Sequence, residues 1–247
     1  MGKIIAVVSG KGGTGKTSFT ANVGLALAVL GKKTLCLDCD ITLRNLDLAL
    51  GLTDKALMDF SDVIAGRCPL SDAAAVHPKY PGLHLLTAPL SPEGQLDVTD
   101  EQMRQLLDQV RQEYDYCLID APAGLGQGFR LATGCADCVV VITTTDASAL
   151  RDAQHTVMLL DKRFTEGHLF LVVGRVQKKL LRALHSTIDD AMDAAGLPLL
   201  GVIPEDEDVP YALNRGIPLR DMNYYAARAY ENIARRITGQ QVPLMRF

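Results

Sequence analysis

Apolar and polar positions along the chain follow two alternating patterns. Short apolar runs rich in β-branched residues predict strands at 3–9, 33–39, 83–88, 115–120, 137–143, 168–174 and 198–203. Between them, apolar residues spaced three or four apart predict helices near 15–30, 100–113, 147–163, 178–196 and 223–238. Because runs such as 138–142 are apolar without alternation, we expect strands buried on both faces. The pattern predicts an α/β fold with a doubly wound, mostly parallel sheet and helices on both of its faces.

In such a sheet, ligands bind beyond the carboxyl ends of the strands. Lys11, Asp40, Asp120 and Thr143 each fall just after a predicted strand. Since these ends meet along one edge of a parallel sheet, we expect the four residues to share one crevice.

Composition sets limits on the rest of the molecule. The chain has 247 residues, 48% of them hydrophobic, and no proline- or serine-rich linker divides it. We therefore expect a single domain over 1–247 with a short tail at 240–247. No apolar run approaches the ~20 residues of a membrane span, and a strand begins at Lys3, where a secretory signal would stand. These features favour a cytoplasmic protein.

The segment 10–17 reads G-K-G-G-T-G-K-T and lies between a predicted strand and a predicted helix. It fits the pattern G-x-x-x-x-G-K-[ST], in which backbone N–H groups surround phosphates, the lysine binds the β/γ oxygens and the final hydroxyl binds Mg²⁺. The helix that follows directs its positive end toward the same anion. The predicted nucleotide-binding residues of this loop are Gly10, Lys11, Gly12, Gly13, Thr14, Gly15, Lys16 and Thr17.

A second lysine distinguishes this loop from a glycine-rich turn. Lys11 and Lys16 both stand at the start of the helix, where positive charges oppose the helix dipole unless an anion lies between them. A turn that only connects a strand to a helix does not explain this pair.

With Lys11 in place, K-G-G-T-G-K-T resembles the deviant Walker A motif of the MinD/ParA family of ATPases. Further segments resemble the same family in the same order along the chain: 37–47 its switch I, 117–124 its Walker B and switch II, 148–152 a partner-facing stretch, and 201–206 with 214–218 its nucleotide-base loop. The resemblance covers most of the chain. It implies a P-loop NTPase fold, a Rossmann-like three-layer sandwich, and a Mg²⁺-dependent ATPase that acts in division-site placement.

The resemblance also implies roles for individual residues. Lys11 is expected to cross the interface of a homodimer formed on ATP, Lys16 to bind the phosphates of its own nucleotide, and Asp40 to orient the attacking water. Thr42 stands where the MinD branch usually has glycine, which predicts a stiffer loop. We expect slow hydrolysis, since no arginine finger is evident beyond Lys11.

Three side chains are expected to serve Mg²⁺: Thr17 directly, Asp120 through water, and Asp38 in the surrounding shell. An alternative is that Asp38 and Asp40 cap the start of a loop or form a salt bridge to Lys32 or Lys33, and that Asp120 caps the turn after its strand. If the strand persists to residue 40, Asp38 and Asp40 point to the same side.

Around the base, the resemblance implies four contact residues: Arg175, Pro204, Glu205 and Asp206. Some relatives carry asparagine where this chain has Gly174, so one contact to adenine is missing from the pattern.

Partner and membrane contacts follow from the same resemblance. The segment from Ser148 to Asp152 is expected to bind division-inhibitor and activator proteins. Members of the MinD branch usually end in a basic amphipathic helix that binds anionic lipid, and residues 240–247, with a central proline, cannot form one. A peripheral position on the inner face of the cell membrane, through Leu244, Met245 and Phe247, stays open beside a purely cytoplasmic one.

Two other functions stay open. A ParA-type DNA partition ATPase would need a basic face, for which the candidates are Lys178, Lys179, Arg182, Arg215, Arg220, Arg228, Arg235 and Arg236, but the net charge of −4 weakens this alternative. A small-molecule kinase or ligase with the same loop would need an acceptor pocket.

Two C-x-x-C pairs raise the question of a metal cluster. Cys36 and Cys39 stand three apart in a predicted strand and so point to opposite faces, which disfavours shared ligation. Cys135 and Cys138 lie at a turn, and an iron–sulfur or zinc site there stays open as an alternative.

Overall fold

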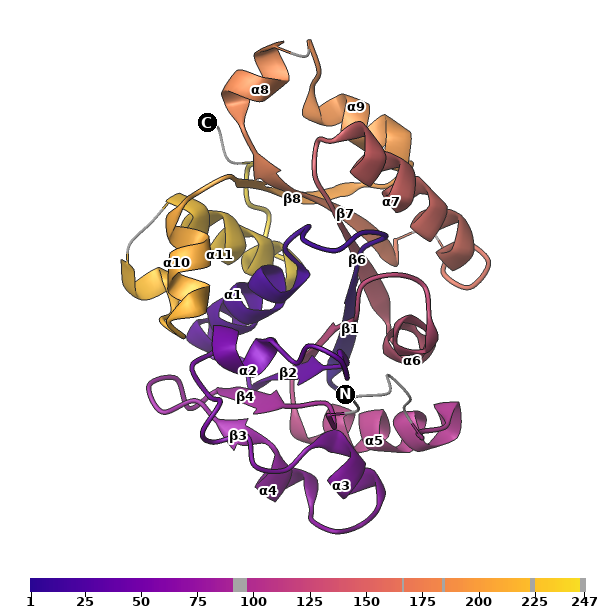
Figure 1. Cartoon of the computed structure of the whole chain (residues 1–247), viewed down its shortest axis with the longest axis vertical. Helices are drawn as coiled ribbons and strands as arrows, with labels where there is room; N and C mark the ends of the chain where they lie inside the picture. The colour runs from indigo at the N-terminus through magenta and orange to yellow at the C-terminus, as the bar shows by residue number, and fades with distance from the viewer. Residues whose placement is uncertain (91–96, 166, 184, 223–224, 245–247) are drawn as a thin grey trace.

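An eight-stranded sheet divides the molecule into two helical layers (Figure 1). The computed structural model describes residues 1–90, 97–165, 167–183, 185–222 and 225–244. The strand order is β3-β4-β2-β5-β1-β6-β7-β8, and every neighbouring pair is parallel except β3 with β4. The strands are β1 (Lys3–Val8), β2 (Thr34–Asp38), β3 (Ala75–Val76), β4 (Leu83–Leu86), β5 (Tyr116–Asp120), β6 (Cys138–Thr143), β7 (Leu169–Val176) and β8 (Leu199–Pro204).

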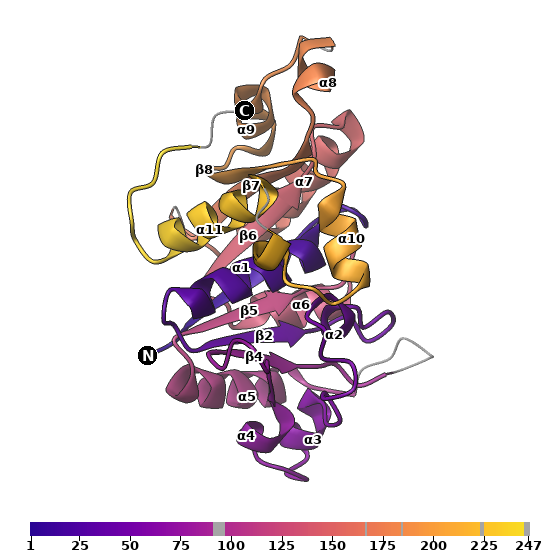
Figure 2. The ribbon, with the colours of Figure 1, turned by 90° about the vertical axis from the view of Figure 1, so that its left-hand side faces the viewer.

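Each face of the sheet carries its own helices, as Figures 1 and 2 show. One face packs against α1 (Lys16–Val29), α2 (Leu46–Ala49), α10 (Asp208–Asn214) and α11 (Tyr225–Ile237), with the short 3₁₀ helix Leu219–Met222 beside them. The other face packs against α3 (Phe60–Ile64), α4 (Leu70–Ala73), α5 (Asp100–Glu113), α6 (Gln127–Gly134), α7 (Ala147–Leu160) and α9 (Ile188–Ala195). The helix α8 (Lys178–Ala183) buries no residue. The predicted doubly wound, mostly parallel α/β fold is therefore confirmed.

Burial explains why the central strands were recognisable. Every residue of β2 and β6 is buried, so these strands have no polar face to produce an alternating pattern. Helices α1 and α11 meet on one side and α7 and α9 on the other, which closes the cores of both layers.

The predicted strands are all present, and the differences lie in short elements. Strand β3 has two residues, and helices such as α2 and α4 have four, too few to show a period. The predicted helix over 178–196 is wrong as one element, because Thr187 begins a second helix with a capping box to Asp190. Residue 184 of the predicted helix 178–196 lies outside the described residues, as do residues 223 and 224 of the predicted helix 223–238.

Four of the six cysteines are buried in the core, and Cys68 and Cys135 lie partly buried against it. Cys36 packs on the α1 face and Cys39 on the opposite face, as the strand geometry predicts. Among the described residues, no group of three or more His, Cys, Asp or Glu side chains has a metal-binding arrangement, so nothing there supports a cluster at Cys135 and Cys138.

No helix within the described part of the chain is both long enough and apolar enough to span a bilayer. Leu244 is half exposed. Met245, Arg246 and Phe247 lie outside the described residues, so the expectation for the tail rests on the sequence there.

Candidate nucleotide-binding site

The strand order brings the ends of four strands together at one edge of the sheet. The carboxyl end of β1 has β5 and β6 as its neighbours, and β2 lies next to β5. Register pairs Asp38 with Asp120 and Val7 with Asp120. The loop after β1 therefore lies beside the acidic ends of β5 and β2.

This loop forms an open cradle at the start of α1. Gly13 and Gly15 have φ of 77° and 100°, the left-handed region that glycine enters without strain. A Cβ at either position would meet no described atom within 4 Å, so the space beside them is free for a ligand. Gly15 is the N-cap, and no described side chain caps α1. The free N–H groups of this helix end make a site for an anion.

Lys16 supplies a cation from inside the cradle. Its side chain is 8% exposed, and Nζ donates a hydrogen bond to Ser9 Oγ at 2.8 Å. Burial lowers the pKa of Lys16, while the negative charges of Asp120 and Asp40 oppose that shift. Phosphate oxygens in the cradle would pair with Lys16 and stabilise its charged form.

Lys11 has a different environment from Lys16. It is exposed, and Nζ donates to Ser148 Oγ on α7 at 3.2 Å. The two lysines of one loop thus point to two places, one into the cradle and one along its outer rim.

The glycine before Lys11 fixes how closely the loop approaches α7. A Cβ at Gly10 would lie 2.5 Å from the carbonyl oxygen of Asp152. The backbone of the loop is therefore packed directly on the helix that carries Ser148.

Thr17 and Asp120 fit a magnesium ion. Thr17 Oγ1 donates to Asp120 Oδ2 at 2.6 Å, and buried Asp120 Oδ1 has no hydrogen-bond partner among the described residues. Burial raises the pKa of Asp120 to about 6, against opposing effects from Thr17 and Lys16. A buried carboxylate oxygen without a partner is costly, and a Mg²⁺ ion or its bound water would satisfy it.

Asp38 holds the loop after β2 through backbone amides. Its Oδ1 accepts the N–H of Asp40 at 2.8 Å, and its Oδ2 accepts the N–H of Leu46 at 3.2 Å. Burial and the neighbouring Asp120 raise the pKa of Asp38 to about 8. Within the described part of the chain, Asp38 is bound by loop N–H groups, as expected if it caps the loop, and it forms no ion pair with a lysine.

Asp40 lies beyond the end of β2, which stops at Asp38, so the condition for both carboxylates to share a strand face is not met. Asp40 Oδ1 accepts hydrogen bonds from the N–H and hydroxyl of Thr42 and from the N–H of Leu43. In this conformation Asp40 caps its own loop.

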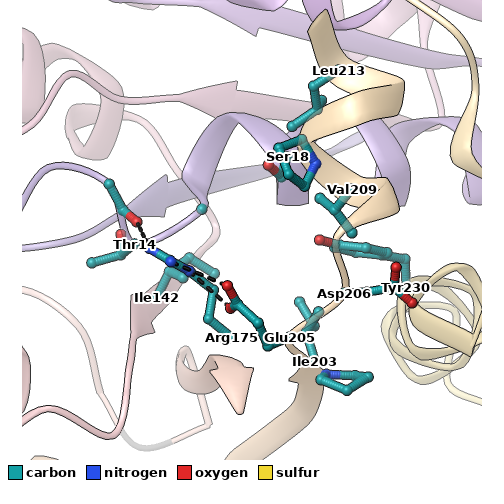
Figure 3. Close-up of a pocket in the computed structure, with 15 residues that line it drawn as sticks. Thr14, Ser18, Ile142, Arg175, Ile203, Glu205, Asp206, Val209, Leu213 and Tyr230 are labelled. Atoms are coloured by element: carbon teal, nitrogen blue, oxygen red, sulfur yellow. Dashed lines mark hydrogen bonds and ion pairs between the residues drawn. The ribbon is translucent and has the colours of Figure 1, made fainter. Parts of the chain in front are cut away.

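A cavity of about 300 Å³ opens beside the cradle (Figure 3). Arg175 spans part of it, with hydrogen bonds to both carboxylate oxygens of Glu205 at 2.9 and 3.1 Å and to the Gly13 carbonyl at 3.3 Å. The ion pair raises the pKa of Arg175. The lining residues are Gly13, Thr14, Gly15, Ser18, Ile142, Gly174, Arg175, Ile203, Pro204, Glu205, Asp206, Val209, Pro210, Leu213 and Tyr230.

The cavity contains all four residues that the sequence proposed for the base. It also contains residues that the sequence did not indicate, chiefly Val209 and Leu213 of α10 and Tyr230 of α11. Their apolar character reads as core packing in the sequence, and only the folded chain brings them to the cradle. At Gly174, a Cβ would approach the Thr14 carbonyl oxygen to 3.3 Å, so the absence of a side chain lets the loop lie close to β7.

A glycine cradle at a helix N-terminus, a buried lysine, a Thr–Asp pair and an adjoining cavity define a P-loop nucleotide-binding protein. The family model described as an AAA domain matches residues 2–166. The septum site-determining protein MinD of Bacillus subtilis is 39% identical over 246 residues, covering 99% of this chain and 92% of that protein. The chain belongs to the MinD family of septum site-determining proteins.

Solved structures agree with this assignment. In the MinC:MinD cell division protein complex of Aquifex aeolicus, a chain superposes with a TM-score of 0.90 at 34% identity, covering 99% of each chain. The MinD protein of Pyrococcus horikoshii, solved with Mg-ADP, has a TM-score of 0.83 at 31% identity and covers 96% of each chain.

Proposed function

We propose that this protein is an ATP-driven switch of division-site placement, which pairs with a second copy when it holds Mg²⁺-ATP and separates after hydrolysis. The observation that carries the proposal is the separation of the two lysines. Lys16 is buried beside Ser9 within the cradle, whereas Lys11 is exposed on its rim beside Ser148. A lysine at the rim is available to the nucleotide of a facing copy.

The chemistry follows from the positions of the side chains. Phosphoryl transfer needs charge stabilisation, a held metal and an oriented water, and bound Mg²⁺ neutralises developing negative charge on the phosphates. Lys16 and the loop N–H groups hold the phosphates, Thr17 and Asp120 hold the metal, and Lys11 adds positive charge from the second copy. Asp40 orients the attacking water.

The base occupies the cavity beside the cradle. Arg175 and Glu205 form its polar wall, with Pro204 and Asp206 adjoining. The apolar side chains from α10 and α11 supply the opposite wall, which suits a flat aromatic base.

The partner surface lies on α7. The Aquifex aeolicus structure is a complex with MinC, which supports a division-inhibitor partner for this chain. We place the contact on the segment from Ser148 to Asp152, where Arg151 is exposed, and an activator protein on the same segment. Alanine at Arg151 and Asp152 is expected to abolish partner binding in a pull-down without changing ATP affinity, and retained binding would reject this surface.

The first test is the mass of the protein in solution by light scattering, with ADP or with ATP and Mg²⁺. Asp40→Ala slows hydrolysis, so ATP should produce a dimer that ADP does not. Lys11→Ala in the same background should remain a monomer while it still binds ATP.

A monomer in every nucleotide state would reject the trans-acting lysine. Phosphate transfer to an added small molecule, rather than release to water, would then favour a kinase. Partition on DNA is less favoured, because Arg220 is paired with Glu231 and Arg236 donates to three carbonyls, which leaves a smaller basic face.

A further inference from the structure

Three donors in the loop after β2 hold the Asp40 side chain, and one of them is a side-chain hydroxyl. Asp40 Oδ1 accepts the Thr42 hydroxyl at 2.6 Å, the Thr42 N–H at 3.0 Å and the Leu43 N–H at 3.0 Å. The N–H bonds arise from the turn and are open to any residue at position 42 except proline. The shortest bond depends on the side chain of Thr42.

We propose that Thr42 is a positioning residue whose hydroxyl slows basal ATP hydrolysis by binding the Asp40 carboxylate. The inference rests on the proposed function, in which Asp40 orients the attacking water.

The number of hydrogen bonds that one carboxylate oxygen can accept determines whether the hydroxyl slows or speeds hydrolysis. Such an oxygen offers about two lone-pair sites, and Asp40 Oδ1 already receives three donors. A lone pair that accepts the Thr42 hydroxyl is not available to accept a hydrogen bond from the attacking water. If Asp40 instead turns toward the phosphates, the same bond has to break first. Both routes make hydrolysis slower with the hydroxyl than without it.

The fold of the loop does not depend on this hydroxyl. Asp38 anchors the loop at both ends through the N–H groups of Asp40 and Leu46, and Thr42 itself is exposed. Removing the hydroxyl therefore changes the surroundings of Asp40 while the loop keeps its main support.

The test compares Thr42→Val, which keeps the shape and loses the hydroxyl, with Thr42→Ser, which keeps the hydroxyl. Single-turnover hydrolysis of ATP is expected to rise about three- to tenfold in Thr42→Val, the factor that corresponds to one net hydrogen bond. Thr42→Ser should stay near the wild-type rate. Affinity for a fluorescent ATP analogue should not change in either variant.

A second measurement uses the nucleotide-free protein. Amide hydrogen exchange at Leu43 should accelerate in Thr42→Val and not in Thr42→Ser, because a less restrained Asp40 caps the turn less firmly. Thr42→Ala serves as a second hydroxyl-free variant if valine disturbs the loop.

An unchanged or slower rate in both hydroxyl-free variants would overturn the inference. Asp40→Asn separates this failure from a failure of the proposed function. If Asp40→Asn hydrolyses ATP slowly while Thr42→Val is unchanged, only the role of Thr42 is rejected. If Asp40→Asn hydrolyses ATP at the wild-type rate, the role of Asp40 is itself wrong.

Discussion

Thr17 Oγ1 and Asp120 Oδ2 lie 2.6 Å apart although the two residues are 103 positions apart in the sequence. The same carboxylate directs a second, buried oxygen toward no described partner. The pair thus presents a hydroxyl and a carboxylate oxygen at one point beside the cradle, as a Mg²⁺ ion coordinated by a nucleotide requires.

Thr17→Val should lower the affinity for Mg²⁺-ATP about 10- to 100-fold, the usual cost of losing a group that supports a metal. The affinity for ATP measured in EDTA should change little, because the cradle and Lys16 are intact. Titration with a fluorescent ATP analogue, with and without Mg²⁺, gives both values. Thr17→Ser is the matched control and should keep the response to Mg²⁺; a full response in Thr17→Val would exclude Thr17 as a ligand.

The two buried carboxylates predict how the nucleotide-free protein responds to pH. Burial raises the pKa of Asp38 to about 8 and that of Asp120 to about 6, so the folded state keeps protons that the unfolded state has lost. The contribution of these two carboxylates to stability is therefore fully present below the ordinary carboxyl pKa of about 4 and is lost as the pH rises toward 8. Burial lowers the pKa values of His77 and His84 and acts in the opposite direction, so thermal unfolding between pH 5 and pH 8 is compared between the wild type and a variant that lacks one of the carboxylates.

Asp120→Asn should remove part of that pH dependence. We expect it to raise the free energy of unfolding by about 1–2 kcal/mol at pH 8 and by less at pH 5, since one unit of pKa corresponds to about 1.4 kcal/mol. Mg²⁺-ADP should flatten the profile of the wild type, because a metal stabilises the charged carboxylates. An identical pH profile for the wild type and Asp120→Asn would contradict this prediction.

The ion pair between Arg175 and Glu205 predicts a modest effect on nucleotide release. Glu205→Gln removes the charge that positions Arg175 against the Gly13 carbonyl. Because the Arg175 side chain is 58% exposed, we expect only about a two- to fivefold increase in the Kd for ADP, mainly through faster dissociation. Stopped-flow release of a fluorescent ADP measures this.

The control for this experiment is Arg67→Gln, which also removes one charge of an exposed ion pair. The Arg67 side chain is also 58% exposed and pairs with Asp62, but neither residue lines the cavity. Release at the wild-type rate is expected for this variant. An equal effect in both variants would show that loss of a surface ion pair, and not the wall of the cavity, is responsible.

The close contact between Gly51 and Gly216, which lie after α2 and α10, predicts that a side chain at either position destabilises the fold. A Cβ at Gly216 would lie 2.5 Å from the Cα of Gly51, and Gly216 has φ of 60°. Gly216→Ala should therefore cost about 2–4 kcal/mol from overpacking and backbone strain, a decrease in Tm of about 4–16 °C.

Gly239→Ala separates the two contributions to this cost. Gly239 has φ of 87°, and a Cβ there would meet no described atom within 4 Å, so only backbone strain applies. Thermal unfolding should give a loss of about 1–2 kcal/mol. A loss as large as that of Gly216→Ala would reject the close contact as the main cause.

The sequence alone indicated most of the fold and the phosphate half of the site. Fully buried strands such as β2 and β6 give continuous apolar runs, and the loop motif is local, so both are visible without tertiary information. The short helices, from four residues in α2 to eight in α6, were not predictable because they cover only one to two helical turns, too few for the apolar pattern to repeat. The helix break before Thr187 depends on a cap that a continuous apolar pattern conceals.

The base half of the site was only partly predictable. Arg175 and Glu205 came from resemblance, whereas Tyr230 and Leu213 look like ordinary core residues until α10 and α11 fold against α1. The hydrogen bonds of the Asp40 carboxylate could not be predicted either, because two of their donors depend on the geometry of the turn and the third is a threonine hydroxyl. Loop conformation, unlike strand burial, leaves no periodic trace in a sequence.

The register that places Asp38 opposite Asp120 also aligns the whole of β2 with β5. A slip of one residue would turn the side chains of β2 to the opposite faces of the sheet and would move Asp38 away from Asp120. The acidic end of the site therefore cannot form in a molecule whose sheet is paired wrongly. Because a ligand stabilises only the state that binds it, bound nucleotide would favour the correctly paired sheet over a mispaired one.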